Sequence, residues 1–167
     1  MVRDPKSQAE QFSRGVRLLE QVRRFGGEPT QFYQSLLEAT GLLTGAQLAL
    51  LMRKSGASNN GWQRVGTWPP EGSPEPGTHA FLRVASDLAS AASEKEAAVA
   101  PLNGAAGGNT TSYGLALRIE GNAPEDALVA VFYLPGCTEM QTAAALRHLR
   151  LVADTPQVYQ MRRAAGE

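Results

Sequence analysis

Residues 127–134, Ala-Leu-Val-Ala-Val-Phe-Tyr-Leu, form the longest uninterrupted apolar stretch of the 167-residue chain. The stretch is too short to cross a bilayer as a helix. In an extended conformation it would present apolar side chains on both faces, because odd and even positions are equally hydrophobic. Strands of that kind lie inside sheets that are covered on both faces. The stretch therefore predicts a buried, central strand.

Four other segments are predicted to be strands of the same sheet. Residues 46–53 are also apolar on both faces, and residues 62–68 carry a tryptophan at each end, so the two predict a hairpin. Residues 113–119 alternate bulky with thin side chains, which indicates a strand with one crowded face. Residues 97–102 predict an edge strand, because Pro101 has no amide hydrogen to donate to a ladder.

The turns between these strands have their own signals. Asn59, Asn60 and Gly61 predict the tight reversal of the hairpin, because these residues accept left-handed backbone conformations. Residues 104–109 predict a flexible loop, and residues 121–126 predict the reversal before the central strand. The first of these turns supports the hairpin, and the last makes the central strand the partner of the strand at 113–119.

Two amphipathic helices are predicted before the first strand. Phe12, Val16, Leu19 and Val22 recur three and four positions apart, which places them on one helical stripe. Two glycines end that pattern, and a second apolar face begins after Pro29, a residue favoured in the first turn of a helix.

Two further helices are predicted later in the chain. One begins near Thr78 and connects the two halves of the sheet. The other is a long C-terminal helix that begins with capping-box spacing at Thr138 and Gln141. Within it, Thr155 before Pro156 predicts a kink or a restart. Helices that are segregated from the strands in this way predict an α+β fold.

The composition favours one compact domain. The chain is 43% hydrophobic and 19% charged, and its sixteen basic residues balance its sixteen acidic ones. Without a net positive charge, binding to nucleic acid is not expected. The single cysteine, Cys137, cannot close an intramolecular disulfide, and the first residues carry no apolar signal-peptide core. A cytoplasmic location is therefore predicted.

The hydrophobic hairpin, the long crossover and the strand at 128–134 that feeds a terminal helix together resemble the GAF domain family over about residues 30–161. The resemblance implies an antiparallel sheet of five, or at most six, strands in the order 2-1-5-4-3. It also implies N- and C-terminal helices on one face, as in GAF and PAS-like sheets, and a small-molecule pocket on the other. Residues 1–28 would then form an N-terminal helix available for dimerisation, residues 29–163 the GAF-like domain and residues 164–167 a tail.

A second, weaker resemblance is to the GAF-like segments that precede membrane-fusion adaptors of the haemolysin-secretion type. It rests on the final strand, the break at Pro135 and Gly136, and the helix that ends with Arg162 and Arg163. This resemblance implies a fragment of a membrane-associated transport protein, with the two arginines on the cytoplasmic side of a following membrane span. Alternatively, the arginines interact with the dipole of their own helix. In neither case is the chain itself expected to insert into a membrane.

The sequence offers no set of residues for catalysis or metal binding. His79 and His148 each lack a second ligand three or four residues away, so no metal site is predicted. Cys137 precedes a helix, where a thiol can be reactive, but the chain has no second cysteine to act as a resolving partner. The residues typical of nucleotide-binding and bilin-binding GAF domains are missing as well. Neither an enzyme nor a bound cofactor is therefore expected.

Two functional hypotheses remain. The first is a sensory or regulatory domain that binds an unidentified small molecule in a pocket between the sheet and the crossover. Trp68, His79, Phe81 and Tyr113 are the residues expected to line that pocket, because aromatic rings and an imidazole can orient a small polar ligand. Packing in the core is the alternative role for each of them.

The second hypothesis is a ligand-free structural or interaction module of a larger protein. Its first and last helices would form a symmetric helical interface between two copies. Phe12, Val16, Leu19 and Leu149 are the residues expected to be buried there. A homodimer is expected under both hypotheses.

Overall fold

The computed structural model describes residues 5–54, 61–72, 78–102, 111–120 and 127–166. The turn predicted at Asn59 and Asn60, the loop at 104–109 and the reversal at 121–126 lie outside these ranges. The elements in chain order are α1 (Pro5–Arg24), α2 (Pro29–Thr44), β1 (Leu48–Lys54), β2 (Trp62–Trp68), α3 (Thr78–Lys95), β3 (Ala97–Leu102), β4 (Thr111–Glu120), β5 (Leu128–Cys137), α4 (Glu139–Leu151) and α5 (Thr155–Gly166).

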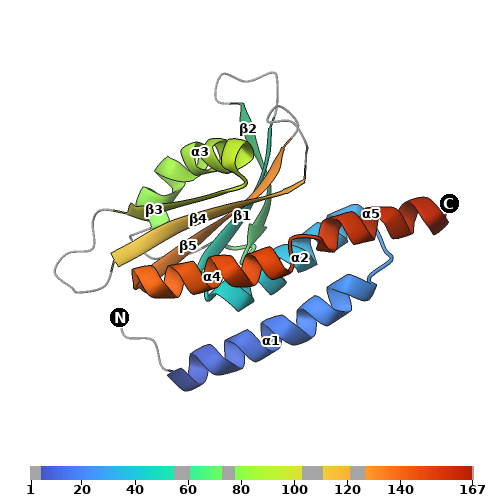
Figure 1. Cartoon of the computed structure of the whole chain (residues 1–167), viewed down its shortest axis with the longest axis horizontal. Helices are drawn as coiled ribbons and strands as arrows, with labels where there is room; N and C mark the ends of the chain where they lie inside the picture. Colours follow the sequence, from blue (N-terminus) through green and yellow to red (C-terminus); the bar gives the residue numbers. More distant parts are fainter. Residues whose placement is uncertain (1–4, 55–60, 73–77, 103–110, 121–126, 167) are drawn as a thin grey trace.

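The strands form one antiparallel sheet in the order β2-β1-β5-β4-β3, which confirms the order that the GAF resemblance implies (Figure 1). The apolar stretch that predicts a central strand is β5, and it pairs with two neighbours. Val131 lies opposite Leu50 of β1 on one side and Ala116 of β4 on the other. The hairpin of β1 and β2 is confirmed too.

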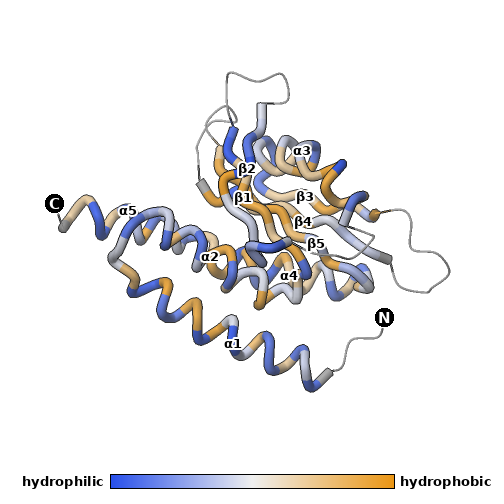
Figure 2. Tube along the Cα trace, turned by 180° about the vertical axis from the view of Figure 1, so that it is seen from behind, coloured by the Kyte–Doolittle hydropathy of each residue, from blue (hydrophilic) through white to orange (hydrophobic). Residues whose placement is uncertain are grey.

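Helices cover both faces of the sheet. Val129, Val131 and Tyr133 of β5 pack with α3, whereas the alternate residues Ala130 and Phe132 pack with α2 and α4. Figure 1 shows α3 on one side of the sheet and α2 and α4 on the other, and Figure 2 shows the most hydrophobic residues in the central strands between them. The apolar character of both faces of β5 therefore reflects two separate hydrophobic clusters.

The helix α1 lies outside this arrangement, on α2 (Figure 1). Leu19 and Val22 of α1 are buried with Phe32 of α2 in a third hydrophobic cluster. The two helices approach closely at Gly15, where a Cβ atom would lie 3.0 Å from the backbone nitrogen of Leu43. The predicted helical layer is confirmed, with α2 and α4 against the sheet and α1 as an outer helix.

The helix ends follow the signals in the sequence. Gly45 closes α2 with φ of 73°, a left-handed conformation that glycine adopts without strain. The predicted capping box of α4 is confirmed: the Gln141 amide donates to the Thr138 hydroxyl over 3.1 Å, and the Gln141 side chain accepts from the Thr138 amide over 2.9 Å. The long terminal helix is interrupted where Thr155 and Pro156 predict it, between α4 and α5.

Two elements extend further than the sequence indicates. The break expected at Pro135 and Gly136 is wrong, because β5 continues through both residues to Cys137, which lies opposite Thr111. Gly136 has φ of 63°, so the strand passes this point through a conformation that favours glycine. The helix α5 runs to Gly166 and so includes most of the segment set aside as a tail.

Successive residues of β3 direct their backbone hydrogen-bonding groups alternately towards β4 and towards the open edge of the sheet. Pro101 lies opposite Tyr113, and the backbone amide of Arg118 donates to the carbonyl of Glu96 over 2.8 Å. In an antiparallel pair the hydrogen-bonding groups of successive residues point alternately towards and away from the partner. The even-numbered residues of β3 therefore bond to β4, and Pro101 lies at a position that points to the open edge.

Candidate functional site

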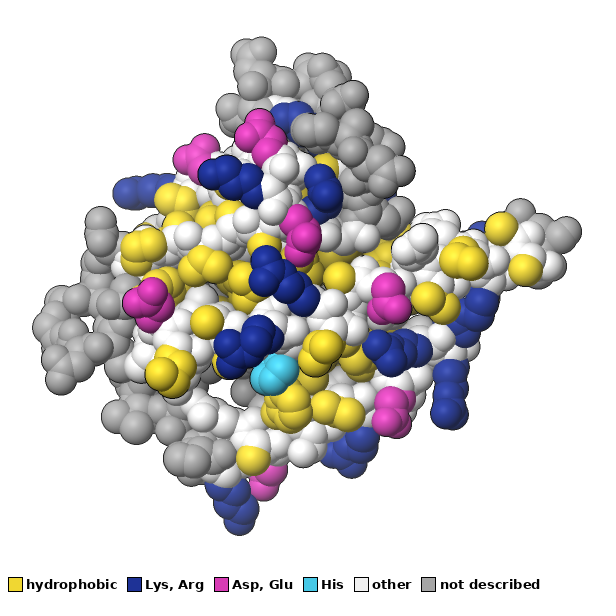
Figure 3. Space-filling model, in the orientation of Figure 1, with side chains coloured by type: hydrophobic (Ala, Val, Ile, Leu, Met, Phe, Trp, Pro, Cys, Tyr) yellow, Lys and Arg dark blue, Asp and Glu magenta, His cyan; other side chains and the backbone are white. Residues whose placement is uncertain are grey.

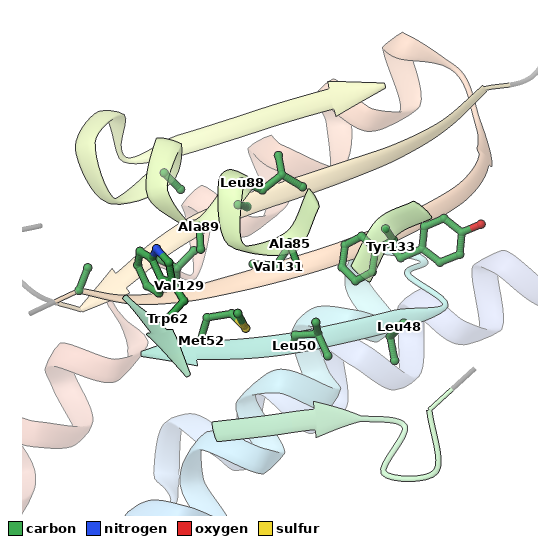
Figure 4. Close-up of a cluster of buried hydrophobic side chains, with 14 of the residues drawn as sticks. Leu48, Leu50, Met52, Trp62, Ala85, Leu88, Ala89, Val129, Val131 and Tyr133 are labelled. Atoms are coloured by element: carbon green, nitrogen blue, oxygen red, sulfur yellow. The ribbon is translucent and has the colours of Figure 1, made fainter. Parts of the chain in front are cut away.

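The face under α3, where the resemblance implies a pocket, is filled by side chains. Phe81 of α3 is fully buried, and its ring centroid lies 5.4 Å from that of Tyr133 of β5. Leu88 lies directly over Gly114 of β4, where a Cβ atom would be 2.5 Å from Leu88 Cδ1. Figure 4 shows α3 side chains such as Ala85 meeting those of β1 and β5. The space between α3 and the sheet is therefore occupied by the protein's own core.

The four predicted pocket residues do not converge on one site. Trp68 lies on the other face of the sheet, over Gly41 of α2, where a Cβ atom would be 2.5 Å from the indole Cε3. Tyr113 also packs on that other face. Phe81 is in the core beneath α3, and His79 is exposed in the first turn of α3. Their binding of a small molecule stays a prediction, because nothing in the structure tests it.

A small pocket does lie in the helical layer, beneath the junction of α4 and α5. It has a volume of about 20 Å³ and is lined by α2, by β1, β4 and β5, and by the junction residues Val152 and Pro156. The wall is almost wholly apolar, and the hydroxyl of Thr40 donates to the Leu36 carbonyl over 2.7 Å. This volume is about that of one water molecule, but a buried water needs polar partners, which the apolar wall hardly offers. We call this space the junction pocket.

A tyrosine is the largest buried side chain that attaches α5 to the rest of the chain. Tyr159 is fully buried and stacks on Phe32 of α2, with ring centroids 3.8 Å apart and planes within 4°. Its hydroxyl donates to the Gly27 carbonyl over 2.6 Å, and Arg163 Nη1 donates to the same carbonyl over 3.1 Å. We call these four residues the Tyr159 cluster. Sequence reasoning missed it, although Tyr159 and Arg163 share one helical stripe with Thr155.

The outer faces of α1 and α4 carry exposed apolar side chains. Phe12 of α1 contacts His148 of α4, with ring centroids 5.1 Å apart. Met140 and Leu151 share a helical stripe with His148 and are 80% and 73% exposed. Phe12 and Val16 form the adjoining stripe and are each 38% exposed. Figure 3 shows hydrophobic side chains gathered along the boundary between the two helices. These five residues are the α1–α4 surface.

Two residues predicted for a helical interface are not on this surface. Leu19 is buried against α2, and Leu149 is buried between α4 and the sheet. Each lies on the inward stripe of its helix, and the sequence pattern cannot tell which apolar stripe faces the protein's own core. The interface prediction is therefore wrong for these two and stays open for Phe12 and Val16.

Groups that could carry chemistry are dispersed. Cys137 is buried, and its sulfur lies 3.8 Å from the Pro135 carbonyl oxygen. His79 and His148 belong to different helices on opposite sides of the sheet. Within the described ranges, no group of three or more His, Cys, Asp and Glu side chains could hold a metal ion. Across the same residues, none of the helices has the length and hydrophobicity that a bilayer span requires.

Comparisons with known proteins identify the fold. No protein-family model and no curated protein matches the sequence. Among solved structures, the GAF domain of A. aeolicus nlh2 in an inactive state is 9% identical, with a TM-score of 0.56 over 93% of this chain and 99% of that one. This chain has the GAF fold.

A second GAF domain agrees. It comes from a protein of Pseudomonas syringae pv. tomato described as a sensor histidine kinase, and it is 15% identical with a TM-score of 0.50. The match covers 97% of this chain and 99% of that one. At identities this low, the structural similarity establishes the shared fold alone. Any ligand or partner must therefore be argued from this chain's own residues.

Proposed function

We propose that this chain is a cytoplasmic sensory or regulatory module that dimerises through the α1–α4 surface and has no catalytic activity of its own. The GAF fold supports the regulatory role, since the two similar structures are GAF domains and one belongs to a protein described as a sensor kinase. The observation that carries the dimer is the exposed apolar stripe of Met140, Leu151, Phe12 and Val16.

The contact between Phe12 and His148 connects α1 to α4 within that stripe. The exposed apolar residues of the two helices therefore lie on adjoining faces. Monomeric proteins rarely expose large contiguous apolar patches, and such patches usually mark an interface. A patch on two neighbouring helices can meet its own copy across a two-fold axis, which is the commonest symmetry of homodimers.

Sedimentation equilibrium tests the dimer. We expect the natural chain to be dimeric at micromolar concentration, and Leu151→Glu to raise the dissociation constant at least tenfold, because it places a charge in the apolar contact. Val65→Glu is the matched control, because Val65 is 46% exposed but lies on β2, away from α1 and α4. A natural chain that stays monomeric across the concentration range would remove the dimer from the proposal.

The filled face under α3 favours a second candidate, a ligand-free interaction module of a larger protein. Phe81, Tyr133 and Leu88 occupy the space in which a ligand would lie. Under this candidate the sheet and α3 are a scaffold, and the helices carry the function.

Thermal-shift measurements with metabolites and nucleotides separate the two candidates. A ligand at a hundred times its dissociation constant stabilises a protein by about 2.7 kcal/mol, which is readily measured. A ligand whose stabilisation is lost in His79→Ala would support the sensory pocket. Stabilisation that this variant retains would place the ligand elsewhere, and no stabilisation by any compound would favour the interaction module.

A further inference from the structure

We propose that α5 is a releasable latch, held by the Tyr159 cluster, whose attachment depends on the position of α1 against α2. The inference rests on contacts within one chain and needs no dimer. It assigns a role to the C-terminal helix that neither the fold nor the proposed interface gives it.

The buried residues of α5 lie on one face of the helix, and beside them Gln160 donates a hydrogen bond to the Tyr33 hydroxyl of α2 over 3.0 Å. Tyr159 is the largest buried side chain of the helix, with Thr155 one turn before it and Arg163 one turn after it. On the outer side, Val158 and Met161 are 42% and 64% exposed. Burial on a single narrow stripe gives a helix a lower local stability than burial within the core.

The first turn of α5 is incompletely satisfied in the docked position. Thr155 is 2% exposed, and its hydroxyl oxygen has no hydrogen-bond partner. The junction pocket lies beside it, lined by Val152, Ala153 and Pro156. An unpaired buried hydroxyl and an incompletely filled apolar space both disfavour the docked form. Release of α5 therefore costs less free energy than release of a fully packed helix would.

The acceptor of the latch belongs to the opposite end of the chain. Gly27 lies in the connection between α1 and α2, and its carbonyl accepts from both Tyr159 and Arg163. Phe25, in the same connection, has its ring centroid 6.4 Å from that of Tyr159. A displacement of α1 moves this connection and weakens both hydrogen bonds together. The arrangement thus links the position of the first helix to the attachment of the last.

Hydrogen exchange measured by mass spectrometry tests whether α5 opens by itself. In the natural chain we expect α5 amides to exchange by an opening that leaves β5 protected. Tyr159→Phe removes the hydroxyl bonded to Gly27 and should speed α5 exchange about tenfold, the factor that corresponds to a bond worth ~1.4 kcal/mol. Tyr133→Phe, which removes the hydroxyl of a buried tyrosine outside the Tyr159 cluster, should leave the protection of α5 relative to β5 unchanged.

A second variant tests the coupling to α1. Gly15→Val places a side chain against Leu43 and should push α1 away from α2, so α5 exchange should rise several-fold although Gly15 is not in the Tyr159 cluster. Arg17→Ala, on the exposed side of α1 and outside the α1–α4 surface, should leave α5 exchange unchanged. The latch is overturned if α5 and β5 open together in the natural chain, or if Gly15→Val raises exchange equally in both. Repeating the measurement on Leu151→Glu separates the latch from the proposed dimer.

Discussion

The two faces of the sheet are packed in different ways although the same strands form both. On the α3 face, β4 presents the thin residues Gly114 and Ala116, and a single helix fits closely onto them. On the other face, β4 presents bulkier residues such as Leu117 to several helices, and the junction pocket remains where α4 ends. The α3 face is therefore closely packed, and the other face adjoins the helices that we propose carry the function.

This difference shows how a fold can separate stability from adaptability. A close-packed face resists change, because a shift of α3 towards β4 would bring Leu88 into collision with Gly114. The helical layer can adjust at its junction pocket and through α5 at a smaller cost. Substitutions that act on one face at a time test this contrast.

The largest effect is expected for Phe81→Ala. Removal of this fully buried ring leaves a cavity beside Tyr133 that α3 cannot close, since Leu88 already rests on Gly114. We expect a loss of about 3–5 kcal/mol in the free energy of unfolding. Urea denaturation measures it. A loss below about 1 kcal/mol would mean that the α3 face is as adaptable as the helical layer.

A matched pair of Val→Ile substitutions compares the two faces directly. Val131 is fully buried beneath α3, so an added methylene should overpack that face and destabilise the chain by about 1–3 kcal/mol. Val152 lines the junction pocket, so the same methylene should enter free space and stabilise by up to about 0.8 kcal/mol. The sign of each change in the urea midpoint decides the comparison, and equal signs would contradict it.

The helix cap at the start of α4 offers a further test with a small expected effect. Thr138→Ala removes the hydroxyl that accepts from the Gln141 amide and should cost about 1 kcal/mol. Thr138→Ser retains the hydroxyl and should recover most of the loss. Circular dichroism during urea denaturation gives both values. If alanine and serine were equally destabilising, the capping box would contribute nothing to the helical layer.

Much of the fold can be predicted from the sequence because its signals are local. The apolar stretch of β5, the alternation in β4 and the spacing of Thr138 and Gln141 each depend on residues that are neighbours in the chain. The order of the strands does not follow from those signals alone, and it was expected only through the resemblance to GAF domains. The continuation of β5 through Pro135 was missed, because it depends on a single glycine conformation.

The candidate site was harder to predict because it depends on which face each side chain takes. Trp68 and Phe81 both suggest a pocket by residue type, yet the register of β2 places Trp68 on the side away from α3. The Tyr159 cluster joins residues that are more than a hundred positions apart, through a backbone carbonyl at Gly27 that no side-chain pattern marks. Information of that kind comes only from the assembled structure.

The position of Pro101 limits how copies of this protein can associate. A strand of another molecule that paired with β3 would lie against Pro101, which has no amide hydrogen to donate. Extension of the sheet between molecules is therefore disfavoured. At high concentration the protein should therefore not form fibrils through pairing of its β3 strands. Pairing through β3 is thereby disfavoured, which agrees with association through the helical surface proposed above.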